Sequence, residues 1–378
     1  TSARIELNEQ GRLRTVSGTA NAELIDATDD STFVSWMASR LASYGEESLP
    51  EPPSHIVEAV DPGGLPLRVH AFEDFETEIE RRWWMTGKLE TSDVAPGRGR
   101  AGRGTITQDF DDLQGQTKTS YTAVVFNPVP GPPMGPRTRL FFRYKLEGTS
   151  VLRVQLYSLS NGYHRYLSLH GLPRGEWRSA TVDMTQMRRP DGSGGPLAAD
   201  ERIDDIQFYV DPRAEVLIDD MILYEAAPDE ESRPFPNRIL FTGWFDTGKQ
   251  GNEWPGDFAI EPHAAPRTWK FAKSVLRKGG KESWLRVGLR GPRPLDEQTR
   301  LRFLYRLSGA ERIGVELADS SSGLARVASL EGANGEEWAE VEVDFPTAED
   351  GMTHADELRF LVPAEAELAI DDLLLYVP

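Results

Sequence analysis

The chain of 378 residues has no cysteine, which excludes disulfides, zinc–thiolate centres, iron–sulfur clusters and cysteine nucleophiles. It has no run of 18 apolar residues, so the sequence predicts no membrane-spanning helix. Positive charge is also scarce, because 61 acidic side chains outnumber 42 lysines and arginines, for a net charge of −19. Such a chain is poorly suited to the phosphates of nucleic acid or to an anionic membrane surface.

Local enzyme signatures are missing as well. The sequence contains no Gly-x-Ser-x-Gly elbow, no phosphate-binding loop and no His-Glu-x-x-His motif. Only His164 and His170, among six histidines, have a spacing that resembles a ligand pair, and that signal is weak. A glycosidase or lyase that gathers its site from distant strands would leave no local motif, so an enzyme remains an alternative.

What the chain does contain is a long internal repeat. Thr138–Asp183 matches Thr299–Asp344 at a constant offset of 161 positions. Both copies then close with the same phrase of an apolar residue, two aspartates and an apolar run, at Ile218–Tyr224 and Ile370–Tyr376. Solenoid repeats have periods of about 20–50 residues, so this self-match indicates two copies of one domain.

The pattern of signals divides the chain into four parts. Residues 1–66 form an N-terminal segment with a Pro-rich linker, 67–226 form repeat one, 227–236 form a charged linker and 237–378 form repeat two. In the N-terminal segment, polar–apolar alternation predicts a hairpin from Ala3–Leu7 and Arg12–Val16, then a strand at Asn21–Ile25. Helical spacing of aromatic and aliphatic residues predicts one helix over Thr32–Tyr44.

Within each repeat the pattern is that of short strands separated by Gly- and Pro-containing turns. This predicts an all-β protein of two tandem β-sandwich (jelly-roll) domains, preceded by a small strand-plus-helix segment. The strands expected in repeat one are Leu140–Leu146, Leu152–Tyr157, Arg165–Leu169, Arg178–Met184, Asp205–Val210 and Val216–Tyr224.

Three motifs carry a resemblance to a known family. They are the opening Phe72–Glu76 with its looser counterpart Trp244–Gly248, the strand starts Gly175–Trp177 and Glu336–Trp338, and the closing phrase. With these motifs each repeat resembles the jelly-roll domains of the galactose-binding-like superfamily, which includes many carbohydrate-binding modules. The resemblance implies a glycan or polysaccharide as partner. It also implies a bacterial protein that is extracellular or at the cell surface, with the periplasm as a further option.

The resemblance implies a structural calcium ion between the first and last strands of a repeat. Calcium prefers carboxylate and carbonyl oxygens. The alternative is that the paired aspartates merely begin a solvated strand with a turn hydrogen bond. The residues that match the calcium position are Glu73 or Glu76 with Asp219 or Asp220 in repeat one, and Asp246 with Asp371 or Asp372 in repeat two.

A difference between the copies predicts where a glycan would bind. Residues 161–166 read Asn-Gly-Tyr-His-Arg-Tyr in repeat one, whereas 322–327 read Ser-Gly-Leu-Ala-Arg-Val in repeat two. Aromatic rings stack on the C–H faces of sugars, so repeat one is the expected binding copy. The alternative is that Tyr166 belongs to the core and Tyr163 covers a sheet edge. The candidate ligand-binding residues are Tyr163, His164, Tyr166, Asn161, Arg165, Tyr121 and Trp84.

The leading interpretation is therefore a non-catalytic, extracellular, carbohydrate-binding protein with repeat two as a spacer or docking module. A second is a structural component of a bacterial surface layer or appendage, in which the N-terminal strands Ala3–Val16 pair with a sheet edge, within the chain or in a neighbour. Its partners would be other surface proteins or further copies of the same chain. A third is a carbohydrate-active enzyme, which release of reducing ends from a polysaccharide would reveal.

Overall fold

A computed structural model gives the arrangement of most of the chain. It describes residues 3–7, 13–18, 55–76, 89–92, 100–108, 120–126, 131–189, 197–198, 200–246, 251, 253–263, 269–332, 335–345 and 351–378. The chain divides into two compact units, Thr1–Pro53 and Ser54–Pro378. Among the described residues no helix has the length and apolar character needed to span a membrane.

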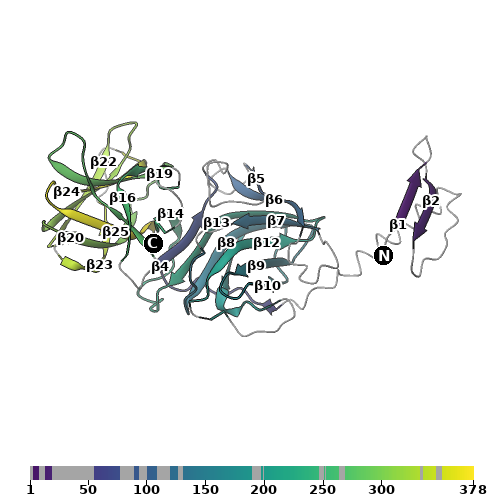
Figure 1. Cartoon of the computed structure of the whole chain (residues 1–378). Helices are drawn as coiled ribbons and strands as arrows, with labels where there is room; N and C mark the ends of the chain where they lie inside the picture. The colour runs from purple at the N-terminus through teal and green to yellow at the C-terminus, as the bar shows by residue number, and fades with distance from the viewer. Residues whose placement is uncertain are drawn as a thin grey trace. The chain divides into compact units, whose positions relative to one another are not determined.

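In the first unit, the described residues form the predicted hairpin. Strand β1 (Ala3–Leu7) pairs antiparallel with β2 (Leu13–Gly18), as Figure 1 shows. The second strand therefore extends two residues beyond the predicted end at Val16. The expected strand Asn21–Ile25 and the expected helix Thr32–Tyr44 lie outside the described residues.

Repeat one is a sandwich of two layers joined by one shared strand (Figure 1). Strand β6 (Ala101–Gln108) is shared, since Gly102 and Arg103 pair with one layer and Thr105–Gln108 with the other. The first layer contains β11 (Arg178–Asp183), β8 (Thr138–Glu147) and β13 (Glu215–Ala226), with β4 (Pro66–Glu73) on β13 and β5 (Leu89–Ser92) on β6. The second layer contains β7 (Ser120–Phe126), β12 (Ile203–Val210), β9 (Leu152–Ser158), β10 (Tyr163–Leu169) and β3 (Ile56–Val57).

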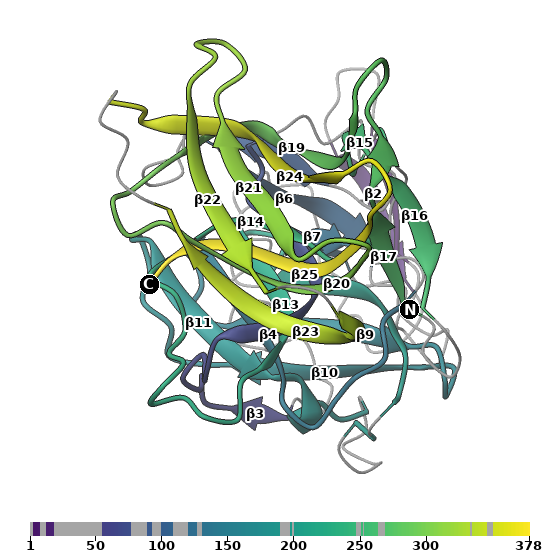
Figure 2. The same cartoon turned by 90° about the vertical axis from the view of Figure 1, so that its left-hand side faces the viewer.

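Repeat two has the same strand order in two separate sheets, whose strands face the viewer in Figure 2. One sheet contains β16 (Ala259–Pro262), β17 (Lys270–Lys273), β25 (Glu367–Val377), β20 (Arg300–Ser308) and β23 (Gly335–Asp344), with β14 (Arg238–Gly243) on β25. The other contains β15 (Gly256–Asp257), β19 (Glu282–Pro294), β24 (His354–Pro363), β21 (Arg312–Ala318) and β22 (Ala325–Glu331), with β18 (Val275–Leu276) on β19. The prediction of two tandem all-β sandwiches is thus confirmed.

Alternation along the strands builds the core between the layers. In β8 every second side chain is buried, which is the pattern of a strand with one face on a core. Across the sandwich Phe142 of β8 meets Phe208 of β12 with ring centroids 4.8 Å apart. Repeat two has the same contact between Phe303 of β20 and Phe360 of β24, at 5.1 Å. Aromatic pairs at this separation add stabilisation beyond the area they bury.

The closing phrase of each repeat is a β-bulge. Asp220 and Asp372 have φ angles of 46° and 49°, in the left-handed region, and the strand register shifts at both sites. The preceding aspartate supports each bulge, because Asp219 accepts a hydrogen bond from the Asp220 N–H at 2.8 Å and Asp371 accepts one from the Asp372 N–H at 2.8 Å. Aspartate suits this position because its short side chain binds the local backbone and tolerates positive φ.

Candidate functional site

The outer face of the second layer of repeat one carries polar and aromatic side chains. Strands β7, β12 and β9 direct Val124, Phe208 and Val154 into the core. Successive residues of a strand point to opposite faces, so the residues before and after these three along their strands lie on the outer face. We call the following set the tyrosine–arginine face: Tyr121, Arg153, Gln155, Tyr166, Gln207 and Tyr209.

Arg153 occupies the centre of the tyrosine–arginine face. Its guanidinium carbon lies 4.5 Å from the ring centroid of Tyr121, 4.8 Å from Tyr209 and 5.2 Å from Tyr166. Next to it, the amide of Gln155 donates to the amide oxygen of Gln207 at 3.0 Å. Rings and amides held in fixed positions offer C–H stacking surface together with hydrogen-bonding groups.

Exposure differs across this face. Gln155 is fully buried and Tyr209 is 2% exposed, whereas Tyr121 is half-buried. On the β9 and β10 side, Tyr157 and His164 are also half-buried and meet edge to face at 4.7 Å. A ligand would therefore approach along the half-buried aromatic side chains at its edges, and the buried residues would hold these in position.

The residues predicted from sequence have different placements. Tyr121, His164 and Tyr166 come from β7 and β10 and lie on the same outer face, but Tyr166 is buried, at 1% exposure. Asn161 is exposed in the turn before β10, where its amide donates to the Ser158 hydroxyl at 3.3 Å. Trp84 and the side chain of Tyr163 lie outside the described residues.

Arg165 has a structural role in this fold. It points to the opposite side of β10, where it is 3% exposed and pairs with Glu201 at 3.1 Å. Burial alone would raise the pKa of Glu201, but hydrogen bonds from Ser158, the Ala198 N–H and Asn161, with the charge of Arg165, lower it below its ordinary value. The arginine is thus committed to a buried ion pair and is not presented to a ligand.

Repeat two has a groove at the corresponding position. It has a volume of about 670 Å³, and we call it the repeat-two groove. The register aligns Gly314 with Arg153, Glu316 with Gln155 and Arg359 with Gln207. The residues that line it include Arg277, Trp284, Arg312, Glu316, Val327 and Arg359.

The acids predicted to bind calcium in repeat two surround an arginine of repeat one. The guanidinium of Arg68 pairs with Asp246, and lies 3.1 Å from Asp372 and 3.7 Å from Asp371. Asp371 also contacts His263 at 2.9 Å. We call this the Arg68 cluster. Its carboxylates do not fit a calcium ion, because a cationic side chain already lies among them.

Burial controls the ionisation of the Arg68 cluster. It would lower the pKa of Arg68, but Asp372, Asp246 and Asp371 raise that pKa above its ordinary value. Burial also raises the pKa of Asp246 to about 6, against the opposing charge of Arg68. Burial and the adjacent Asp372 raise the pKa of Asp371 well above its ordinary value. The cluster therefore gains a proton more easily than exposed carboxylates would.

In repeat one the predicted calcium residues are arranged differently. A carboxylate oxygen of Glu73 accepts from the Phe75 N–H at 2.6 Å, and Asp220 lies 3.4 Å from Arg143. Asp219 is fully buried behind its bulge, and Glu76 is half-buried. Within the described part of the chain, no three acidic or histidine side chains are grouped to hold a metal ion. Calcium in repeat one stays a prediction.

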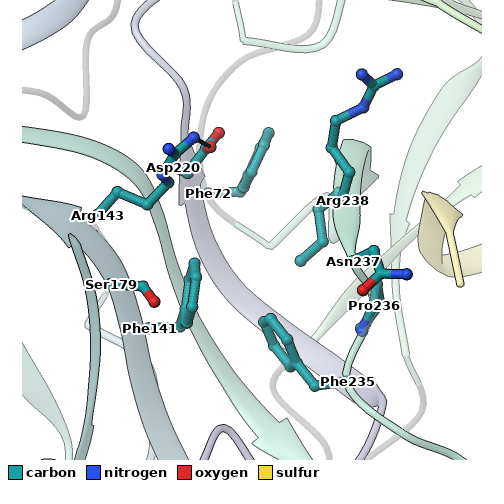
Figure 3. A pocket seen from close by; sticks show the side chains of 10 residues that line it. Phe72, Phe141, Arg143, Ser179, Asp220, Phe235, Pro236, Asn237 and Arg238 are labelled. Atoms are coloured by element: carbon teal, nitrogen blue, oxygen red, sulfur yellow. Dashed lines mark hydrogen bonds and ion pairs between the residues drawn. The ribbon is translucent and has the colours of Figure 1, made fainter. Parts of the chain in front are cut away.

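Beside Asp220 there is a pocket of about 340 Å³, shown in Figure 3. Phe72, Phe141 and Phe235 line it, and the Arg143–Asp220 pair lies at one side. The rings of Phe141 and Phe235 are 5.0 Å apart, so residues of repeat one and of the predicted linker share this wall.

Known proteins are similar to this chain at the level of solved structures. No protein-family model matches it, and no curated protein matches it. Among solved structures, the tandem CBM22-1-CBM22-2 domain of Paenibacillus barcinonensis Xyn10C is 14% identical, covers 85% of this chain and 99% of its own, and gives a TM-score of 0.28. The family 11 carbohydrate-binding module of Clostridium thermocellum Lic26A-Cel5E is 21% identical, covers 42% of this chain and 95% of its own, and gives a TM-score of 0.29.

A third similar structure is the CBM22-2 xylan-binding domain from the same Paenibacillus protein. It is 14% identical, covers 42% of this chain and 99% of its own, and gives a TM-score of 0.27. These three structures are carbohydrate-binding modules. Similarity at these scores says nothing about the ligand, which has to be argued from the side chains.

Proposed function

We propose that the chain is a non-catalytic, extracellular protein that binds a neutral glycan at the tyrosine–arginine face of repeat one. The observation that carries this proposal is Arg153 enclosed by Tyr121, Tyr166 and Tyr209, on the outer face of a sandwich layer. This set of rings and amides lies outside the hydrophobic core between the two layers, although most of its members are buried. A sugar uses both chemistries, ring stacking and hydrogen bonding, at once.

The polar groups of this face also favour a neutral ligand. Arg153 is the one charged member of the face, and it is held among rings. Gln155 and Gln207 are uncharged, and their buried amides bond to each other. The half-buried rings of Tyr121 and Tyr157 provide the stacking surface.

Substitution of the half-buried rings tests the proposal. Tyr121→Ala and Tyr157→Ala should each weaken retardation of the full chain in gels that contain a neutral soluble polysaccharide it binds. Tyr305→Ala serves as the control, because Tyr305 is half-buried on β20 of repeat two, away from this face. Equal retardation of all three variants would remove the tyrosine–arginine face as the binding site.

A further inference from the structure

The repeat-two groove differs in charge from the tyrosine–arginine face. Its floor is open at Gly314, which stands where Arg153 stands in repeat one. The large aromatic ring of this floor comes from a different strand than in repeat one. Leu361 of β24 stands where Tyr209 stands on β12, and Trp284 of the neighbouring β19 stands where Ala123 stands on β7. Repeat two thus keeps an aromatic platform, which the alignment of 161–166 with 322–327 does not reveal.

Two guanidinium groups lie close to the ring of Trp284. The guanidinium carbon of Arg277 is 4.8 Å from its ring centroid and that of Arg286 is 5.7 Å away. Val327, on the other side of the groove, is 52% exposed. Apolar surface beside a cation is the combination that a sugar ring bearing an acidic group would contact.

The cations of the groove fall into two classes. Arg359 pairs with Glu357 at 2.6 Å and Arg312 pairs with Glu331 at 3.2 Å, so carboxylates of the sheet already neutralise them. Arg277 and Lys281, in contrast, have no carboxylate partner among the described residues, and both are exposed. They belong to the turn between β18 and β19, which brings them to one end of the groove.

The geometry of this turn is well defined. The Gly280 N–H donates to the Arg277 carbonyl at 2.9 Å, and the Arg277 N–H donates to the Glu282 carbonyl at 3.0 Å. Gly279 adopts a φ of 75°, which a side chain would disfavour. The turn therefore holds Arg277 and Lys281 near the groove, in a protein whose net charge is −19.

We propose that the repeat-two groove binds an acidic polysaccharide, with the carboxylate of a uronic acid residue at Arg277 and Lys281, the ring of that residue against Trp284, and a later sugar residue of the polysaccharide against Val327. Repeat two is then a second binding module and not a spacer. This inference goes beyond the function proposed for repeat one, since it concerns another sheet and another class of sugar, and it can hold if repeat one binds nothing.

The experiment uses the full chain in gels that contain polygalacturonate, alginate or hyaluronate, with mixed-linkage β-glucan and galactan as neutral polysaccharides. Arg277→Ser/Lys281→Ser removes the free cations, and Trp284→Ala removes the platform. The control Arg174→Ser/Arg213→Ser removes two exposed cations of repeat one, so it matches the change in net charge. Thermal melting of each variant shows whether it is folded.

We expect retardation by at least one uronate polysaccharide. The Arg277→Ser/Lys281→Ser variant should bind it more weakly by on the order of tenfold, the loss expected of a charge-assisted contact. The control should bind as the unmodified chain does. Tyr121→Ala should leave uronate binding unchanged, which separates this site from the one proposed in repeat one.

Three results would overturn the inference. The first is no retardation by any of the uronate polysaccharides. The second is equal uronate binding by the Arg277→Ser/Lys281→Ser variant and the control. The third is that double-stranded DNA and dextran sulfate retard the chain as strongly as the uronate polysaccharides do. That result would show that the groove binds polyanions in general. Loss of neutral-glycan binding alone would count against the proposal for repeat one and not against this one.

Discussion

The guanidinium of Arg68, in repeat one, lies 3.1 Å from the carboxylate of Asp372, in the closing bulge of repeat two. The closing bulge of repeat one has its own arginine, since Asp220 lies 3.4 Å from Arg143. A second buried pair runs the other way, from Arg293 of repeat two to Asp74 of repeat one. Reciprocal buried ion pairs fix the two repeats against each other, because either carboxylate left alone would be costly to bury.

Removal of Arg68 should destabilise the protein strongly. Arg68→Met leaves Asp246, Asp371 and Asp372 buried without their cation, which typically costs about 3–5 kcal/mol. The measurement is urea unfolding at pH 7.5. Arg143→Met is the control, because the Arg143 side chain is 31% exposed and the pair should contribute less. Equal losses for the two variants would contradict the role assigned to Arg68.

The Arg68 cluster should also make stability depend on pH. The folded pKa of Asp246 is raised from 3.8 to about 6, because burial outweighs the charge of Arg68. Between about pH 4 and 6 the folded protein keeps a proton on Asp246 that the unfolded chain has released. The stabilisation that this proton gives is therefore complete below pH 4 and is lost as pH rises through 6. Arg68, His70, Asp371 and Asp372 are the neighbouring charged or titratable groups.

Asp246→Asn should therefore remove part of the dependence of stability on pH. The stability of the unmodified chain relative to Asp246→Asn should be greater at pH 4.5 than at pH 7.5, by about 1.4 kcal/mol for each unit of pKa shift expressed in that range. Urea unfolding of both proteins at the two pH values gives the difference. A larger relative stability at pH 7.5 would show that the pKa of Asp246 is lowered and not raised.

Calcium offers a separate test of the Arg68 cluster. In Arg68→Ala the three carboxylates lose their cation, and millimolar calcium should then raise the melting temperature more than it does for the unmodified chain. Any calcium bound in repeat one contributes equally to both proteins and cancels in the comparison. Equal calcium effects would show that the carboxylates of repeat two do not act together as a cation site.

Tyr166 provides a prediction about stability. Its ring is 1% exposed and packs near Arg153, so Tyr166→Ala should cost about 3 kcal/mol of unfolding free energy, as large-to-small core changes do. The half-buried Tyr305 should cost less when changed to Ala. Thermal and urea unfolding give both values. A Tyr166→Ala variant as stable as the unmodified chain would show that the ring is not packed.

Particular residues show how far the sequence could predict this structure. The strands of repeat one were predictable, because alternation and Gly/Pro turns are local signals, and β8 and β9 lie where the pattern indicates. The closing Asp-Asp phrase was recognised as a marker, but its meaning as a bulge depends on backbone angles. A further Asp-Asp pair, Asp204-Asp205, makes the same hydrogen bond as the two closing pairs, from the Asp205 N–H to the Asp204 carboxylate at 2.9 Å.

The candidate site was predictable only in part. His164 and Tyr166 were indicated by the difference between the copies at 161–166, and Tyr121 by its expected place on a neighbouring strand. Arg153, Gln155 and Tyr209 gave no such signal, because they occur on strands with ordinary polar–apolar alternation. The buried ion pair of Arg165 could not be predicted, because its partner Glu201 is 36 positions away in sequence. The Arg68 cluster could not be predicted, since it joins residues of different repeats that are 304 positions apart.

The most direct test of the central claim is affinity electrophoresis of the unmodified full chain against a broad panel of neutral soluble polysaccharides. The account predicts selective retardation by at least one of them, which the Tyr121→Ala variant loses and the Tyr305→Ala variant retains. No retardation by any neutral polysaccharide, at any gel concentration used for known binders, would contradict glycan binding by repeat one. Concentration-dependent self-association of the same chain would then favour a structural role.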